Sequence, residues 1–219
     1  MKQLGSLLGL LALIVICWQY PILYPLKLLV VFFHESSHAL ATLFTGGSVK
    51  ELVIVPQEGG HVVSQGGNTF IIFSAGYLGS LLWGVAIYLA SVKTRYDQLI
   101  MMILGSIVII ITVLFGRSLF SWVFGLLIGS AMIFSGKRLS EEVNDFALRI
   151  IGLTNMLYVP LDIYSDTISR SYLHSDAYLL AQATFGTTLM WGGIWLLVSL
   201  AVIIYCLKWS LVHQQTTTQ

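Results

Sequence analysis

Long apolar runs separated by short polar breaks make up most of this chain. A run of about 20 apolar residues is long enough to cross the hydrocarbon core of a bilayer as a helix. The runs that approach this length cover residues 4–20, 28–44, 69–91, 99–115, 119–135, 146–169 and 184–209. The weakest predictions are the boundary at Arg117 and the run containing Pro160, because proline ends or kinks a helix. The pattern predicts an all-α polytopic membrane protein with six to seven transmembrane helices.

The pattern changes its period between the second and third runs. Residues 48–65 predict a small β-hairpin, because strand-like alternation surrounds a turn with proline and glycine, and the glycine pairs 46–47 and 66–67 bound it. An open strand edge cannot face lipid, so this hairpin must lie at the interface or within the protein. There it either pairs with an extended peptide, with Gly59 and Gly60 as candidate substrate-binding residues, or serves only as a connection.

The composition agrees with a membrane-embedded protein. Of the 219 residues, 57% are hydrophobic and 10% are charged, against roughly 25% charged residues in a soluble domain. The formal net charge is +1 without a basic cluster, so nucleic-acid binding is not expected. We expect one domain over residues 1–219, embedded in the lipid bilayer. No small-residue cleavage site follows the first apolar run, so this run is expected to remain as a span.

Three ionisable residues interrupt the second apolar run, in the sequence His34-Glu35-Ser36-Ser37-His38. On a helix, His34 and His38 lie at i and i+4, so both imidazoles project from one face, where a single Zn²⁺ can bind them. Glu35 is placed to act as the general base on a zinc-activated water. The competing interpretation is a pair of histidines hydrogen-bonded to neighbouring helices beside a protonated Glu35. Ionisable groups at bilayer depth cost about 2.5–3.5 kcal/mol each unless paired or bound to metal, which favours the functional interpretation.

A third zinc ligand is expected, because catalytic zinc sites usually take three protein ligands and one water. A polar stripe at helical spacing in the sixth run supplies candidates, and its members are Asn155, Tyr158, Asp162, Ser165, Asp166 and Ser169. Asp162 is the first candidate, because Pro160 distorts the backbone where a ligand and a substrate would meet. Asp166 is the alternative, although Arg170 at i+4 offers it an ordinary ion pair.

Another carboxylate, Asp176, lies beside apolar sequence further along the chain. Ser175 or Asp176 can cap the helix that follows, which gives this position an ordinary structural role. His61 and His174 are candidates for a ligand or a proton shuttle only if they fold back over the site. These residues are therefore secondary candidates.

Small residues recur four positions apart in the third apolar run, where Ala75 pairs with Gly79 and Gly76 with Ser80. Such pairs let the backbone of a neighbouring helix approach closely. We interpret them as packing positions that take no part in chemistry.

These features together resemble the site-2 protease family of intramembrane zinc metalloproteases. The resemblance rests on the His34–His38 motif, the glycine-rich hairpin, the Ala75-Gly76 segment, and the stretch from Asn155 to Pro160-Leu161-Asp162. In that family a stretch ending in Leu-Asp-Gly supplies the third ligand, which implies Asp162 here. This chain departs from the pattern, because Ile163 follows Asp162 where the family has glycine. The resemblance also makes Asn155 a candidate substrate-binding residue. The similarity is closer to a compact branch called peptidase M50B-like, through the segments Asp162-Ile163, Asp166-Thr167-Ile168 and Ser175-Asp176-Ala177.

The resemblance implies a zinc metalloprotease that hydrolyses peptide bonds in or near the transmembrane segments of membrane-spanning proteins. It implies that the two histidines and either Asp162 or Asp166 hold Zn²⁺, with Glu35 as the catalytic residue. The alternative is a catalytically inactive binding or chaperone module that retains the zinc site. A zinc transporter is the least favoured function, because the fourth and fifth runs offer almost no polar residues for a path.

Overall fold

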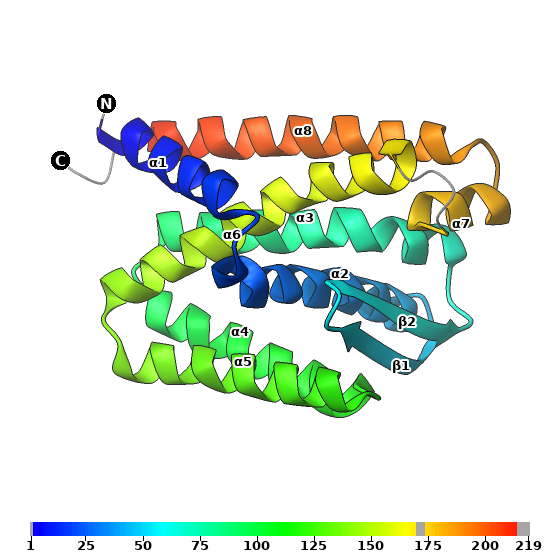
Figure 1. Ribbon diagram of the computed structural model, residues 1–219, viewed down its shortest axis with the longest axis horizontal. Coiled ribbons are helices and arrows are strands. Elements are labelled where there is room, and N and C mark those ends of the chain that lie inside the picture. Colours follow the sequence, from blue (N-terminus) through cyan, green and yellow to red (C-terminus); the bar gives the residue numbers. More distant parts are fainter. Residues whose placement is uncertain (1, 170–173, 214–219) are drawn as a thin grey trace.

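The computed structural model describes residues 2–169 and 174–213, in which helices predominate (Figure 1). The long helices and the shorter α7 are α1 (Lys2–Cys17), α2 (Tyr24–Phe44), α3 (Thr69–Lys93), α4 (Asp97–Phe115), α5 (Leu119–Arg138), α6 (Glu141–Tyr164), α7 (Asp176–Ala183) and α8 (Thr188–His213). A short 3-10 turn, η1 (Pro21–Leu23), precedes α2, and a π-helical turn, η2 (Ser165–Ser169), continues α6. The strands β1 (Ser48–Val55) and β2 (Gly59–Gln65) form an antiparallel hairpin, as predicted.

Five helices are long and apolar enough to cross a membrane, namely α3, α4, α5, α6 with η2, and α8. A sixth candidate span is Gly9–Cys17 together with Pro21–Phe44, a pair bent by 108°. The chain is therefore an integral multi-pass membrane protein, with five or six spans among the described residues. The predicted number of six to seven transmembrane helices agrees with this result at six when the bent pair is counted as one span.

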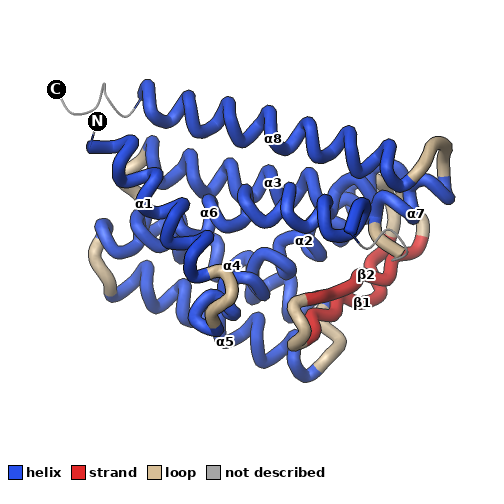
Figure 2. The backbone as a smooth tube through the Cα atoms, turned by 45° about the horizontal axis from the view of Figure 1, so that its top comes forward, coloured by secondary structure: helices blue, strands red, loops and turns tan. Residues whose placement is uncertain are grey.

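The long helices lie side by side in a bundle (Figures 1 and 2). One edge of the bundle is α8, the opposite edge is the pair α4 and α5, and α2, α3 and α6 lie between them. The helix pairs that contact each other most extensively are α4 with α5, α3 with α6, and α2 with α3. The hairpin and α7 lie at the same end of the bundle, toward which α2 runs.

Polar residues begin five of the helices. At each start, a side-chain oxygen accepts a hydrogen bond from the backbone N–H three residues later, an N-cap that stabilises a helix by about 1 kcal/mol. The capping residues are Asn68 before α3, Ser118 before α5, Ser140 before α6, Ser175 before α7 and Thr187 before α8. The Ser175 cap fixes the start of α7, so Asp176 is the first residue of that helix.

The outer edge of β1 is bonded to the connection between α4 and α5. The Arg117 N–H donates to the Leu52 carbonyl at 3.3 Å, and the Ile54 N–H donates to Ser121 Oγ at 2.7 Å. The backbone groups of Leu52 and Ile54 therefore point away from β2. The opposite edge of the hairpin belongs to β2.

The tip of the hairpin is anchored to the start of α2. The Tyr24 hydroxyl donates to the Pro56 carbonyl at 2.6 Å, and Lys27 Nζ lies 3.2 Å from Glu58 Oε2. The same ammonium group lies 5.2 Å from the centre of the Trp18 ring, a cation–π contact. The hairpin is thus attached at its tip to α2 and along β1 to the α4–α5 connection.

Glycines bring α4 and α5 into close contact. A Cβ atom added at Gly105 would lie 2.6 Å from the Gly129 carbonyl oxygen. One added at Gly129 would lie 2.8 Å from the Gly105 carbonyl oxygen and 2.6 Å from Ile109 Cγ1. These glycines therefore let two helix backbones meet, as small residues commonly do between membrane helices.

Candidate metal centre and active site

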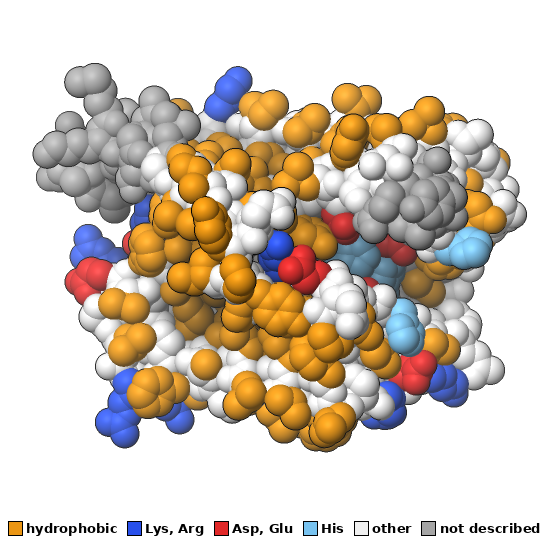
Figure 3. All heavy atoms as spheres, viewed as in Figure 1, with side chains coloured by type: hydrophobic (Ala, Val, Ile, Leu, Met, Phe, Trp, Pro, Cys, Tyr) orange, Lys and Arg blue, Asp and Glu red, His pale blue; other side chains and the backbone are white. Residues whose placement is uncertain are grey.

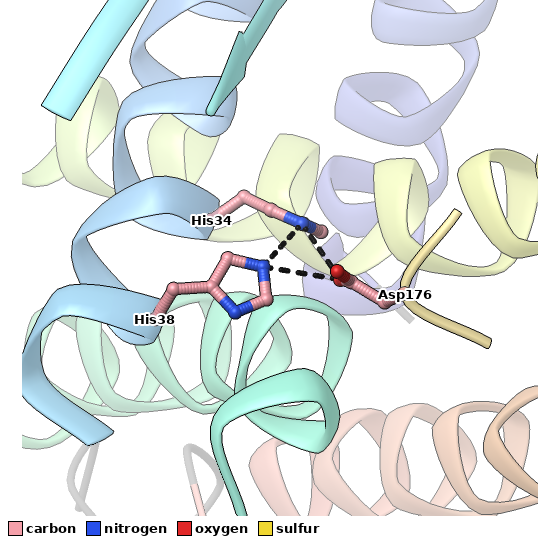
Figure 4. Close-up of side chains that lie close together, drawn as sticks. All are labelled: His34, His38 and Asp176. Atoms are coloured by element: carbon pink, nitrogen blue, oxygen red, sulfur yellow. Dashed lines mark hydrogen bonds and ion pairs between the residues drawn. The ribbon is translucent and has the colours of Figure 1, made fainter. Parts of the chain in front are cut away.

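Two histidines of α2 and one aspartate of α7 bring three metal-ligating atoms together (Figure 4). His34 Nε2 and His38 Nε2 each lie 3.1 Å from Asp176 Oδ2. The two nitrogens lie 3.2 Å apart. The three atoms form a nearly equilateral triangle, which we call the ligand triangle.

Local structure on α2 and α7 places these side chains. His34 and His38 are one helical turn apart, so their imidazoles share the face that the i, i+4 spacing predicts. Asp176 follows the Ser175 cap at the start of α7. Ala177 and Leu180 are then fully buried where α7 packs on α3 and α8, which holds the carboxylate over α2.

Neighbouring helices orient the two imidazoles. His38 Nδ1 lies 2.7 Å from the Ile72 carbonyl oxygen in the first turn of α3. Because a carbonyl only accepts, Nδ1 carries the proton and Nε2 presents its lone pair to the triangle. The His34 ring meets the Tyr77 ring edge to face, with centroids 5.1 Å apart, and the Tyr77 hydroxyl donates to Asp166 Oδ2 at 2.9 Å.

The donor set and its spacing fit a zinc ion. Zinc takes imidazole nitrogens and carboxylate oxygens at about 2.0–2.2 Å in a tetrahedral arrangement, which keeps the ligand atoms about 3.3 Å from one another. The separations of 3.1–3.2 Å within the ligand triangle are close to that value. Three protein donors leave a fourth position for water or substrate, as in catalytic zinc sites.

The surroundings of Asp176 favour its ionised form. Burial alone raises the pKa of this carboxyl, but when the imidazoles are protonated, the charge of His38 and the hydrogen bonds that His34 and His38 donate outweigh burial and hold the pKa well below its ordinary value. An ionised carboxylate is the form that binds a cation. The same contacts also satisfy a carboxylate paired with a protonated histidine, so metal analysis is the measurement that separates the two interpretations.

The ligand triangle lies in a cavity of about 440 Å³ between α2, the hairpin, α3, α6 with η2, and α7. Figure 3 shows histidine and acidic side chains gathered in a recess on a largely hydrophobic face. Glu35 lines the cavity and is only 6% exposed. The strand β2 lies directly against it, because a Cβ atom at Gly60 would lie 2.7 Å from Glu35 Cγ. A proton acceptor and a strand therefore border the same space as the triangle.

The other two predicted carboxylates line the same cavity but lie outside the triangle. Asp162 lies on α6, and Asp166 lies on η2 about one turn later. Arg170, the predicted ion-pair partner of Asp166, lies outside the described residues. The third atom of the triangle comes from Asp176, for which the sequence favoured helix capping, and Ser175 provides that cap instead.

The remaining predicted site residues separate into two groups. Those that line the cavity are Gly59, Gly60, His61 and His174. Asn155 is fully buried between α3 and α6, where it accepts a hydrogen bond from the Ser80 hydroxyl at 3.3 Å and donates one to the Ile151 carbonyl at 3.1 Å. Its contacts therefore join helices, and it is not among the residues that line the cavity.

A family model described as Peptidase M50B-like matches residues 7–206. The match runs from α1 into α8, so it includes the hairpin, α7, Glu35 and all three residues of the ligand triangle. No curated protein and no solved structure matches the chain.

Proposed function

This chain belongs to the peptidase M50B-like family, and we propose that it is an intramembrane zinc metalloprotease that cleaves membrane-spanning proteins in or near their transmembrane segments. The observation that carries the proposal is the ligand triangle, with sides of 3.1–3.2 Å, beside a buried Glu35. This constellation lies in a multi-pass membrane protein, where buried ionisable groups usually serve a function.

We assign His34, His38 and Asp176 as the residues that hold Zn²⁺. When bound there, zinc lowers the pKa of a coordinated water toward about 7 and polarises a peptide carbonyl. The bond from His38 to the Ile72 carbonyl supports this assignment, because it leaves Nε2 as an acceptor for the ion. Asp162, the candidate favoured by the sequence, competes for the role of third ligand because it lines the same cavity.

Glu35 is the proposed general base. It follows His34 on α2 and borders the cavity, so its carboxylate is available to a water held at the triangle. In the reaction Glu35 accepts a proton from the attacking water and delivers it to the leaving amine of the cleaved peptide. Its burial beneath β2 excludes bulk water from this transfer.

The outer edge of β2 is the proposed docking strand for the substrate. In an antiparallel pair, the N–H and C=O groups of two opposite residues either point toward each other or both point away from the partner strand. Leu52 and Ile54 point outward on β1 and pair with Val62 and Gly60, so these two residues of β2 also point outward, on the cavity side. A substrate helix that unwinds can pair with them as an added strand.

Zinc analysis joined to a cleavage assay tests the proposal. The full chain, purified in detergent, should hold about one zinc per chain and cleave a single-span protein with an epitope tag at each end. Glu35→Gln should keep its zinc and lose cleavage, because only the proton acceptor is removed. A wild-type chain without zinc would refute the metal site, and cleavage by Glu35→Gln at the wild-type rate would refute the role of Glu35. Zinc without any cleavage by the wild-type chain would favour the inactive binding or chaperone module.

A further inference from the structure

Gly76 of α3 lies where the three donors of the ligand triangle converge. A Cβ atom added at Gly76 would lie 2.5 Å from His34 Nε2 and 2.5 Å from His38 Nε2, and it would also contact Asp176 Oδ2. One point in space therefore touches all three donors, and it is the point at which any residue other than glycine would place its side chain.

A position this close to two nitrogens and an oxygen has no room for a carbon atom, because non-bonded carbon contacts require about 3.5 Å or more. We propose that Gly76 allows the three donor atoms to converge, because any side chain at this position would force them apart. The backbone of α3 then closes one face of the ligand triangle and leaves the opposite face for the zinc ion. This inference rests on the proposed function, because it takes the ligand triangle to be a zinc site.

Gly79 shows that the effect belongs to Gly76 in particular. Both glycines lie on α3 and face α2, three residues apart. A Cβ atom at Gly79 would lie 2.5 Å from Ser37 Cβ and 2.6 Å from Ser37 Oγ. Gly79 is thus a packing residue, as the sequence pattern predicts. Gly76 instead faces the three donor atoms of the ligand triangle, which the packing interpretation does not take into account.

The contacts at Gly76 also indicate that a substitution there spares the fold. The three atoms nearest to a new Cβ are the ends of three side chains, and none of these three belongs to the backbone. Alanine is in addition a better helix former than glycine. Gly76→Ala should therefore fold and lose the metal, because the methyl group displaces the three donor atoms.

The experiment compares the wild-type chain with Gly76→Ala and with the control Gly193→Ala, whose added Cβ meets no atom within 4 Å outside its own helix backbone, each as the full chain in detergent. Zinc content is measured by elemental analysis, and the melting temperature is measured with and without added Zn²⁺, because a ligand that binds only the folded state raises it. We expect about one zinc per chain and a zinc-dependent rise in melting temperature for the wild type and Gly193→Ala. For Gly76→Ala we expect at least a tenfold loss of bound zinc and no such rise.

Two results overturn the inference while leaving the proposed function intact. One is a Gly76→Ala chain that holds as much zinc as the wild type; the other is an equal loss of zinc in folded Gly193→Ala. A wild-type chain without zinc would instead refute the proposed function itself.

A further variant covers the case in which Gly76→Ala does not fold. If the methyl group collides only with the donor atoms of the three side chains, removing two of these side chains in a His34→Ala/Asp176→Ala background should restore a folded Gly76→Ala chain. Folding is seen as a single symmetric peak in size-exclusion chromatography. Continued misfolding in that background would overturn the inference, because the collision would then lie elsewhere.

Discussion

The α2–α3 pair and the α4–α5 pair are both brought together by glycines, but the glycines face different atoms. In α4 and α5, the missing side chains of Gly105 and Gly129 leave room for carbonyl oxygens of the facing backbone. In α3, the missing side chain of Gly76 leaves room among three polar side-chain ends. A missing Cβ therefore marks a contact between backbones in one pair and a place where three polar side chains converge in the other.

The difference lies in what can move. A helix backbone cannot withdraw without separating the two helices, so an added methyl group between α4 and α5 strains the fold. The side-chain ends around Gly76 can withdraw, so a methyl group there removes a site and leaves the fold. The site half of the molecule (α2, α3, α7 and β2) and the scaffold half (α4, α5 and β1) should thus respond to substitutions in opposite ways.

The largest expected effect is at the third ligand. Asp176→Ala should weaken zinc binding by more than about 100-fold, because even the partners of metal ligands typically contribute 10–100-fold. Asp162→Ala and Asp166→Ala are the matched controls in the same cavity and should weaken it by less than about tenfold. Zinc affinity is measured by competition with a chelator. Loss of zinc in Asp162→Ala with zinc retained in Asp176→Ala would instead support the ligand set that the sequence first predicts.

The next effect is on the docking edge of the site half. Val62→Pro removes an N–H that points away from β1, so the hairpin should persist and zinc should remain bound. Cleavage of the doubly tagged single-span protein should fall by about tenfold, which corresponds to one lost hydrogen bond of about 1.4 kcal/mol. Val62→Ala keeps the N–H and should cleave at nearly the wild-type rate. Equal rates for the proline and alanine variants would argue against strand addition at β2.

A methyl group in the scaffold half should act on stability alone. Gly129→Ala forces a Cβ against the Gly105 carbonyl and should lower the free energy of unfolding by about 1–3 kcal/mol, as overpacking does. Its zinc content should equal that of the wild type. The control is Gly193→Ala, where no atom lies within 4 Å of the added Cβ and the change should stay within about 0.5 kcal/mol. Zinc loss in folded Gly129→Ala would remove the contrast between the halves.

The smallest effect is expected at the hairpin tip. Lys27→Met removes the ion pair with Glu58, whose side chains are 12% and 35% exposed, and should lower the free energy of unfolding by at most about 1 kcal/mol. Thermal unfolding in detergent measures it, with Glu58→Gln as the reciprocal variant. Zinc content should be unchanged in both. A loss of zinc in either variant would show that the anchored tip supports the site more directly than its position suggests.

Much of the fold follows from the sequence because its signals are local. Apolar runs of sufficient length mark the spanning helices, and the predicted hairpin over residues 48–65 has the same outer bounds as β1 and β2 together. Two features depend on tertiary packing and were not predicted. The chain bends by 108° between the first two apolar runs, and α7 forms as a separate short helix before the last span.

The site divides in the same way. His34, Glu35 and His38 share a helix, so their spacing alone predicts their geometry. The third atom of the triangle comes from 142 residues further along, and helix periodicity cannot say which of several acids the fold brings there. One local signal was available: the serine at 175 already supplies the helix cap, which leaves the neighbouring Asp176 for another role.

The bonded outer edge of β1 has a consequence for copies of this protein that meet in a membrane. Exposed strand edges are templates for edge-to-edge association, and a hairpin with two open sides can extend such an association without limit. Here the α4–α5 connection occupies the outer edge of β1, so edge-to-edge pairing of two molecules through β2 would stop at the pair and would not continue into a longer sheet.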